Sequence, residues 1–127
     1  MTSYKVLIVD DETDIVEISK DVFDSEGHQA TASTCALEAL EILVRDPSFD
    51  IIISDSNMPN LSGVEFFYKV RELFAGDHPN FFLSTGDFSL KKDELVAQGM
   101  SGVILKPYDV DHLVDFIVKN HMRLEAA

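Results

Sequence analysis

The sequence is poor in cysteine and in basic residues. Cys35 is the only cysteine, so no internal disulfide can form, and no CxxC pair or Cys/His cluster offers a zinc site. Ten Lys and Arg residues stand against 23 Asp and Glu residues, which gives a formal net charge of −13. An acidic chain is repelled by phosphate backbones and anionic lipid surfaces. The composition therefore predicts no direct binding to nucleic acid and no association with membranes.

Long hydrophobic runs are also missing. No segment approaches the ~18 apolar residues of a membrane-spanning helix. The early apolar run Val6–Val9 is too short for the core of a signal peptide. Together with the single cysteine, this predicts a cytoplasmic protein. No linker-like segment divides the 127 residues, of which 46% are hydrophobic, so we expect one globular domain over residues 1–127.

Short apolar runs alternate with helical patterns along the whole chain. Strands are expected at Tyr4–Val9, His28–Ala32, Phe49–Ser54, Asn80–Ser84 and Gly102–Leu105. Helices are expected near Thr13–Glu26, Cys35–Arg45, Gly63–Phe74, Leu90–Gln98 and Asp109–His121. Runs such as Val6–Val9 and Ile51–Ile53 are apolar throughout, which indicates strands buried on both faces. The pattern predicts an α/β fold, a single doubly wound domain with a five-stranded parallel sheet flanked by five helices.

Several local details follow from the same patterns. Asp109 is expected to cap the last helix, and Thr34 to cap the second. The third helix is expected to pack against the core through Val64, Phe66, Phe67, Val70, Leu73 and Phe74. The histidines are scattered and are expected at the surface: His28, His78, His112 and His121.

Polar residues follow four of the predicted strands. Asp10 and Asp11 follow the first, Asp55 the third, Thr85 the fourth and Lys106 the fifth. Each has an ordinary explanation as a turn, cap or loop residue. Ligands of such sheets, however, bind beyond the carboxyl ends of the strands, which would bring these side chains together.

Clustered carboxylates require a counter-charge. Two like charges ~4 Å apart repel by about 4 kcal/mol at an effective dielectric constant of ~20, so the cluster needs a cation or a raised pKa. A set of oxygen ligands suits Mg²⁺. A carboxylate held beside Mg²⁺, a lysine and a hydroxyl can also attack a phosphoryl group and form an aspartyl phosphate.

These motifs resemble the receiver domains of bacterial two-component response regulators, of the CheY type, over essentially the whole chain. The resemblance rests on Val9–Glu12, on Asp55–Pro59 with Gly63, on Thr85-Gly86 and on Gly99–Pro107, at separations similar to those of the family. It implies strand order 2-1-3-4-5.

The resemblance also assigns roles to site residues. Asp55 would be the phosphoacceptor, and Thr85 and Lys106 would contact the phosphoryl group. Asp11, Asp55 and the backbone carbonyl of Asn57 would bind Mg²⁺ directly, whereas Asp10 would act mainly through a metal-bound water. The Lys106–Pro107 peptide would be cis.

The resemblance implies partners as well. A sensor histidine kinase or a phosphotransfer protein would supply the phosphoryl group from a phosphohistidine. Output to an unidentified target protein or effector domain would pass through the fourth helix, fifth strand and fifth helix, over Ser89–Gln98 and Val103–Asn120. The same face could support a homodimer.

The sequence departs from the family at Val103, where an aromatic residue usually couples to the Thr85 hydroxyl. Val103 is therefore either a plain core residue or a sign that switching relies on backbone shifts around Thr85–Phe88. Asn57 and Asp87 stand at positions that, in the family they resemble, tune hydrolysis of the phosphoryl group, and their polar side chains predict that phosphate loss is not slow. Tyr108 is expected to pack against the last helix.

Three other functions compete with this one. A haloacid-dehalogenase-type phosphatase would carry its nucleophile after the first strand in a DxD-type motif, which Asp10–Thr13 fits poorly. A flavodoxin-like carrier would need a Ser/Thr/Gly-rich loop where Asp10–Glu12 stands. A phosphorylation-independent scaffold is disfavoured because the site residues are complete. The leading prediction is a signalling module that catalyses only its own phosphorylation and dephosphorylation.

Overall fold

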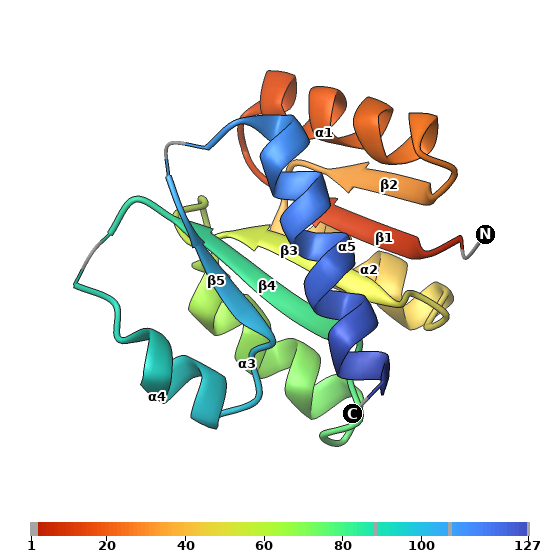
Figure 1. Cartoon of the computed structure of the whole chain (residues 1–127). Helices are drawn as coiled ribbons and strands as arrows, with labels where there is room; N and C mark the ends of the chain where they lie inside the picture. Colours follow the sequence, from red (N-terminus) through yellow and green to blue (C-terminus); the bar gives the residue numbers. More distant parts are fainter. Residues whose placement is uncertain (1–2, 88, 107, 127) are drawn as a thin grey trace.

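The computed structural model describes residues 3–87, 89–106 and 108–126. Within these residues, five parallel strands form one sheet in the order β2-β1-β3-β4-β5 (Figure 1). The strands are β1 (Lys5–Val9), β2 (Gln29–Ser33), β3 (Ile51–Asp55), β4 (Asn80–Thr85) and β5 (Gly102–Leu105). The helices are α1 (Thr13–Ser25), α2 (Ala36–Arg45), α3 (Gly63–Leu73), α4 (Lys92–Ala97) and α5 (Val110–Ala126). The predicted fold and strand order are confirmed.

The two faces of the sheet carry separate hydrophobic clusters because side chains alternate along each strand. On one face, the sheet packs against α1 and α5 through residues such as Ile8, Ile53, Phe23 and Ile117. On the other face, it packs against α2, α3 and α4 through residues such as Leu7, Ile52, Leu43, Phe66 and Leu95. In Figure 1, α5 crosses in front of the sheet while α2 lies behind it. The central strands are therefore buried on both faces, as their continuous apolar runs predict.

Capping fixes where two of the helices begin. Ser62 and Glu65 form a capping box at the start of α3, with reciprocal hydrogen bonds of 3.1 Å. The Asp109 carboxylate accepts from the Asp111 N–H at 2.9 Å, so the predicted cap of α5 is confirmed. The predicted cap by Thr34 is wrong, because Cys35 holds the N-cap position of α2 without a side-chain hydrogen bond.

The aromatic face of α3 is core, as predicted. Phe66, Phe67 and Val70 are fully buried, and Val64 and Phe74 pack at the edge of the same cluster. Leu73 departs from the prediction, since 43% of its surface is exposed. Among the residues that the structure describes, no helix combines the length and apolar character needed to cross a membrane.

The prediction that all four histidines lie at the surface is wrong for His121, which is only 5% exposed. The Asn80 side-chain amide lies 2.8 Å from His121 Nδ1, and the edge of the Tyr4 ring packs on the imidazole. His28 and His78 are half-buried and His112 is exposed. Asn80 satisfies one of the two ring nitrogens of this buried residue, whereas Nε2 has no hydrogen-bond partner among the described residues.

Candidate functional site

The register of the sheet brings three charged side chains to one edge. Asp10, Asp55 and Lys106 each stand two positions beyond a residue that faces α1 and α5, namely Ile8, Ile53 and Ile104. Alternation along the strands places all three on that same side of the sheet. They also lie at the carboxyl ends of their strands, where open parallel sheets bind ligands.

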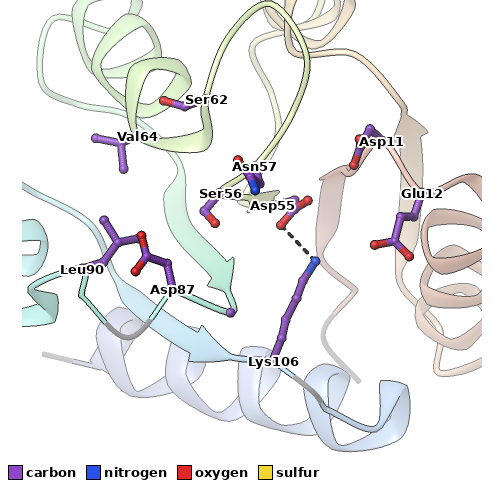
Figure 2. A pocket seen from close by; sticks show the side chains of 11 residues that line it. Asp11, Glu12, Asp55, Ser56, Asn57, Ser62, Val64, Asp87, Leu90 and Lys106 are labelled. Carbon is purple, nitrogen blue, oxygen red and sulfur yellow. Dashed lines mark ion pairs between the residues drawn. The ribbon is translucent and has the colours of Figure 1, made fainter.

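The charged atoms lie within contact distance of one another. Lys106 Nζ is 3.0 Å from Asp55 Oδ1 and 3.9 Å from Asp10 Oδ2. Carboxylate oxygens of Asp10, Asp11 and Asp55 all lie within 4.8 Å of each other. Asp10 and Asp55 are 3% and 4% exposed, whereas Asp11 is exposed. Figure 2 shows Lys106 reaching Asp55, with Asp11 beside Asp55 on the side away from Ser56. One lysine thus faces three carboxylates.

The electrostatics of Asp10 reflect this excess of negative charge. Burial, with the charge of Asp55 added, raises its pKa from 3.8 to about 6, even though the Glu12 N–H donates to Asp10 Oδ1 at 2.9 Å and thereby lowers it. Burial opposes the charged form of Lys106, but the hydrogen bond to Asp55 and the two nearby carboxylates raise its pKa overall. Lys106 therefore stays cationic, and Asp10 lacks a sufficient counter-charge.

The donor set fits a hard divalent cation. Within the described part of the chain, Asp10, Asp11 and Asp55 form the one cluster of metal-ligating side chains, and all its donors are oxygens. A divalent cation would supply the charge that the buried Asp10 lacks. Asn57 lines the same pocket, two residues beyond Asp55.

Gly63 fixes the loop that follows Asp55. The first turn of α3 approaches this loop so closely that a Cβ on Gly63 would lie 2.3 Å from the Asp55 carbonyl oxygen. The Gly63 N–H donates to the Ser56 carbonyl at 2.9 Å. Only a residue without a side chain permits this contact, so α3 holds the backbone of Asp55 and Ser56 in place.

Thr85 lies at the same edge but on the other side of the sheet. It ends β4, is fully buried, and its hydroxyl accepts from the Asp87 N–H at 2.9 Å and from the Ser56 hydroxyl at 2.8 Å. Above these residues is an open pocket of about 920 Å³, lined among others by Asp55, Ser56, Asn57, Gly86, Asp87 and Lys106. Of the predicted site residues, Asp11, Asp55, Asn57 and Lys106 line this pocket. The buried Asp10 and Thr85 do not line it, but they contact the lining residues Lys106 and Ser56.

Two contacts were not foreseen from the sequence. One is the Ser56 hydrogen bond to Thr85. The other is a hydrogen bond between Tyr108 and Ser84. Tyr108 packs on the α1/α5 side as predicted, and its burial raises its pKa although the hydrogen bond with Ser84 lowers it. Val103 packs against the α2–α4 cluster as a core residue. Pro107 and Phe88 lie outside the described residues, and with them the predicted cis peptide and one end of the Thr85–Phe88 segment.

A parallel sheet in this order, with a cluster of carboxylates and a lysine at its carboxyl edge, defines a receiver-type signalling domain. The chain belongs to the response regulator receiver domain family, whose model matches residues 6–118. It is thus a receiver domain of the two-component response regulators, a class of signalling domains and not of classical enzymes.

Relatives of known name support this assignment. Response regulator SaeR of Staphylococcus epidermidis is 37% identical over 109 residues, which cover 86% of this chain and 46% of that protein. Sporulation initiation phosphotransferase F of Bacillus subtilis is 24% identical over 119 residues and 94% of each chain. The chain thus spans about half the length of the SaeR relative.

Solved structures agree with the observed fold. The chemotaxis response regulator CheY4 of Vibrio cholerae matches with a TM-score of 0.82 and 29% identity, covering 94% of this chain and 99% of that one. The response regulator TrrA of Thermotoga maritima, solved in complex with Mg(2+)-BeF, matches with a TM-score of 0.77 and 25% identity over 92% of this chain and 98% of that one.

Proposed function

We propose that this receiver domain accepts a phosphoryl group on Asp55 from the phosphohistidine of a sensor histidine kinase or a phosphotransfer protein. The observation that carries the proposal is the contact of Lys106 Nζ with Asp55 Oδ1 at 3.0 Å, next to three carboxylates whose oxygens lie within 4.8 Å. Family membership supports phosphorylation-dependent signalling, and it argues against the phosphatase and flavodoxin-like alternatives.

Asp55 is the nucleophile in this proposal. Its carboxylate oxygen forms a bond to phosphorus while the phosphorus–nitrogen bond of the phosphohistidine breaks, and the departing imidazole takes up a proton. Lys106 stabilises a phosphoryl oxygen as a point charge, and the Thr85 hydroxyl donates a hydrogen bond to another.

Mg²⁺ would be held by Asp11, Asp55 and the backbone carbonyl of Asn57, with Asp10 acting through a water. Bound there, it supplies positive charge that offsets the carboxylates and the incoming phosphoryl group. The residues are suited to this task because Lys106 alone leaves the buried carboxylate of Asp10 under-compensated.

Output passes to a target protein or effector domain through the face made by α4, β5 and α5. Leu105 and Val96 are exposed on these elements and offer apolar contacts. The same face would serve homodimerisation. The proposal also includes a cytoplasmic location and a single domain over residues 1–127. In it, Asn57 and Asp87 set the lifetime of the phosphoryl group.

Incubation with acetyl phosphate and Mg²⁺, followed by intact mass measurement, tests the proposal. We expect a gain of one phosphoryl group that is lost in Asp55→Asn and in the presence of EDTA. Asp21→Asn, an exposed site on α1, is the matched control and should gain the group normally. A folded wild-type protein that gains nothing would favour a scaffold role, and a gain that survives Asp55→Asn would refute the assignment of the phosphoacceptor.

A further inference from the structure

Ser56 and Thr85 are joined by a hydrogen bond that follows from the strand register. β3 and β4 pair in parallel with Asp55 opposite Ser84. The Ser56 N–H extends this ladder by donating to the Ser84 carbonyl at 2.9 Å. The next opposed pair is Ser56 and Thr85, whose side chains lie on the same face of the sheet, and their hydroxyls meet at 2.8 Å.

This contact fills the accepting capacity of the Thr85 hydroxyl. A hydroxyl has two lone pairs and one hydrogen. The lone pairs receive the Ser56 hydroxyl at 2.8 Å and the Asp87 N–H at 2.9 Å. Among the described residues, both hydrogen bonds of this buried hydroxyl are ones that it accepts. Its hydrogen is therefore left to donate to a group that enters the pocket beside Asp55.

The same contact starts a chain of hydrogen bonds that runs toward α4. Asp87, whose N–H donates to Thr85, accepts from the Ser89 N–H at 2.9 Å through its carboxylate. Ser89 lies three residues before α4 begins at Lys92. The neighbour of Asp55 is thus connected through side-chain hydroxyls and a carboxylate to the segment that enters α4. In Figure 2, Ser56 and Asp11 lie on opposite sides of Asp55.

We propose that Ser56 is a positioning residue, which orients the Thr85 hydroxyl as a hydrogen-bond donor for a phosphoryl group on Asp55 and links that group to the segment before α4. This inference rests on the proposed function. Ser56 acts through Thr85, so removal of its hydroxyl leaves Thr85 free to rotate and to accept hydrogen bonds where it should donate. The acidic residues and Lys106 are untouched by this change.

The test compares Ser56→Thr with Ser56→Val, two side chains of nearly equal volume that differ in the hydroxyl. Binding of beryllofluoride, a phosphoryl mimic, is measured by calorimetry in saturating Mg²⁺, together with the rate of phosphorylation by acetyl phosphate. We expect Ser56→Val and Ser56→Ala to bind beryllofluoride about 2- to 10-fold more weakly, the worth of one hydrogen bond. Ser56→Thr should retain the wild-type affinity, and Mg²⁺ affinity should be unchanged in all three.

Two controls isolate the role of Thr85. In a Thr85→Ala background, Ser56→Ala should cause no further loss of beryllofluoride affinity, because Ser56 then has no hydroxyl to orient. Ser101→Ala removes a hydroxyl that also bonds a neighbouring strand, accepting from the Phe81 N–H at 3.1 Å at the opposite end of the sheet. It should leave beryllofluoride affinity at the wild-type value.

The outcomes separate this inference from the function on which it rests. If the wild-type protein is phosphorylated on Asp55 but Ser56→Val binds beryllofluoride as tightly as Ser56→Thr, the positioning role is wrong. An equal loss from Ser56→Ala with and without Thr85 would also overturn it. If the wild-type protein takes no phosphoryl group at all, the proposed function itself fails.

Discussion

Replacing Asp10 by Asn should stabilise the metal-free protein near neutral pH. Burial, with the charge of Asp55 added, raises the pKa of Asp10 from 3.8 to about 6, so keeping it ionised in the fold costs about 3 kcal/mol. Asparagine has the same shape and keeps an oxygen for the Glu12 N–H. The 3.9 Å ion pair with Lys106 lowers the pKa of Asp10 and is therefore already included in this cost. We therefore expect a net increase of about 1–3 kcal/mol in the free energy of unfolding.

The gain should depend on pH in a defined direction. An acid whose pKa is higher in the folded state contributes stability below its unfolded pKa of 3.8, and this contribution is lost as the pH rises through about 6. The variant should therefore match the wild-type protein near pH 4 and exceed it fully above about pH 7. Burial lowers the pKa of His121, which gives the opposite trend. That trend is common to both proteins and cancels in their difference.

Urea unfolding followed by circular dichroism, in EDTA and across this pH range, measures the difference. Asp21→Asn is the control for the general loss of one negative charge. Adding Mg²⁺ should stabilise the wild-type protein, by about 2.7 kcal/mol at a free concentration of about 100 times Kd, and the variant by much less. The reasoning fails if Asp10→Asn is less stable than wild type in EDTA near neutral pH, or if the difference does not change with pH.

Three further changes have defined outcomes. Gly63→Ala forces a Cβ to within 2.3 Å of the Asp55 carbonyl oxygen and should lower the free energy of unfolding in urea by more than about 2 kcal/mol. Gly86→Ala, at a position with space for a Cβ, should lower it by less, and equal losses would contradict the close-contact argument. Phe66→Ala, in the α2–α4 cluster, should lower the free energy of unfolding by about 3–5 kcal/mol and leave the Mg²⁺ affinity measured by calorimetry unchanged. A weakened affinity would show that packing of the core determines the geometry of the metal site. Lys106→Met should lower the rate of acetyl phosphate labelling at least about tenfold while Mg²⁺ binding persists, because it removes the cation that contacts the phosphoryl group; an unchanged labelling rate would contradict that role.

Much of the fold could be predicted because the apolar pattern records burial. Ile51–Ile53 is apolar throughout and proves to be a central strand covered on both faces. The position of His121 was within reach of the same reasoning. It follows the buried Leu113 and Ile117 at four-residue intervals on α5, but its polarity suggested the surface. Its burial depends on Asn80 and Tyr4, which come from distant parts of the chain and cannot be inferred from local periodicity.

Element ends were less predictable than element types. α4 begins at Lys92 and spans six residues, where Leu90–Gln98 was expected. α5 continues to Ala126, beyond the expected end at His121. Part of the reason is visible in the contacts, since the hydroxyl of Tyr4, the residue before β1, donates to Glu125 in the last turns of α5 at 2.9 Å. A contact over this sequence separation is a tertiary effect.

The sequence predicts the charged residues of the site, but it predicts only part of the contacts made by the hydroxyl residues Ser56 and Thr85. Asp10, Asp55 and Lys106 converge because any open parallel sheet brings its strand ends to one edge. The pairing of Ser56 with Thr85 depends on the relative register of β3 and β4, and a slip of one residue would turn Ser56 to the other face. Register comes from the packing of whole strands, so the sequence around Ser56 does not reveal its partner.

The alternation of the strands also divides the site into two parts with different tasks. Asp10, Asp55 and Lys106 lie on the side of α1 and α5, where burial makes the charge of Asp10 costly. Ser56 and Thr85 lie on the side of α2–α4, where uncharged hydroxyls meet a segment that leads to α4. Charge compensation and orientation of the phosphoryl group are thus assigned to two sets of side chains, and among the described residues no side-chain hydrogen bond or ion pair joins one set to the other. For this reason Asp10→Asn and Ser56→Ala should have additive effects on the free energy of unfolding, whereas Ser56→Ala and Thr85→Ala, which remove two ends of one hydrogen bond, should not.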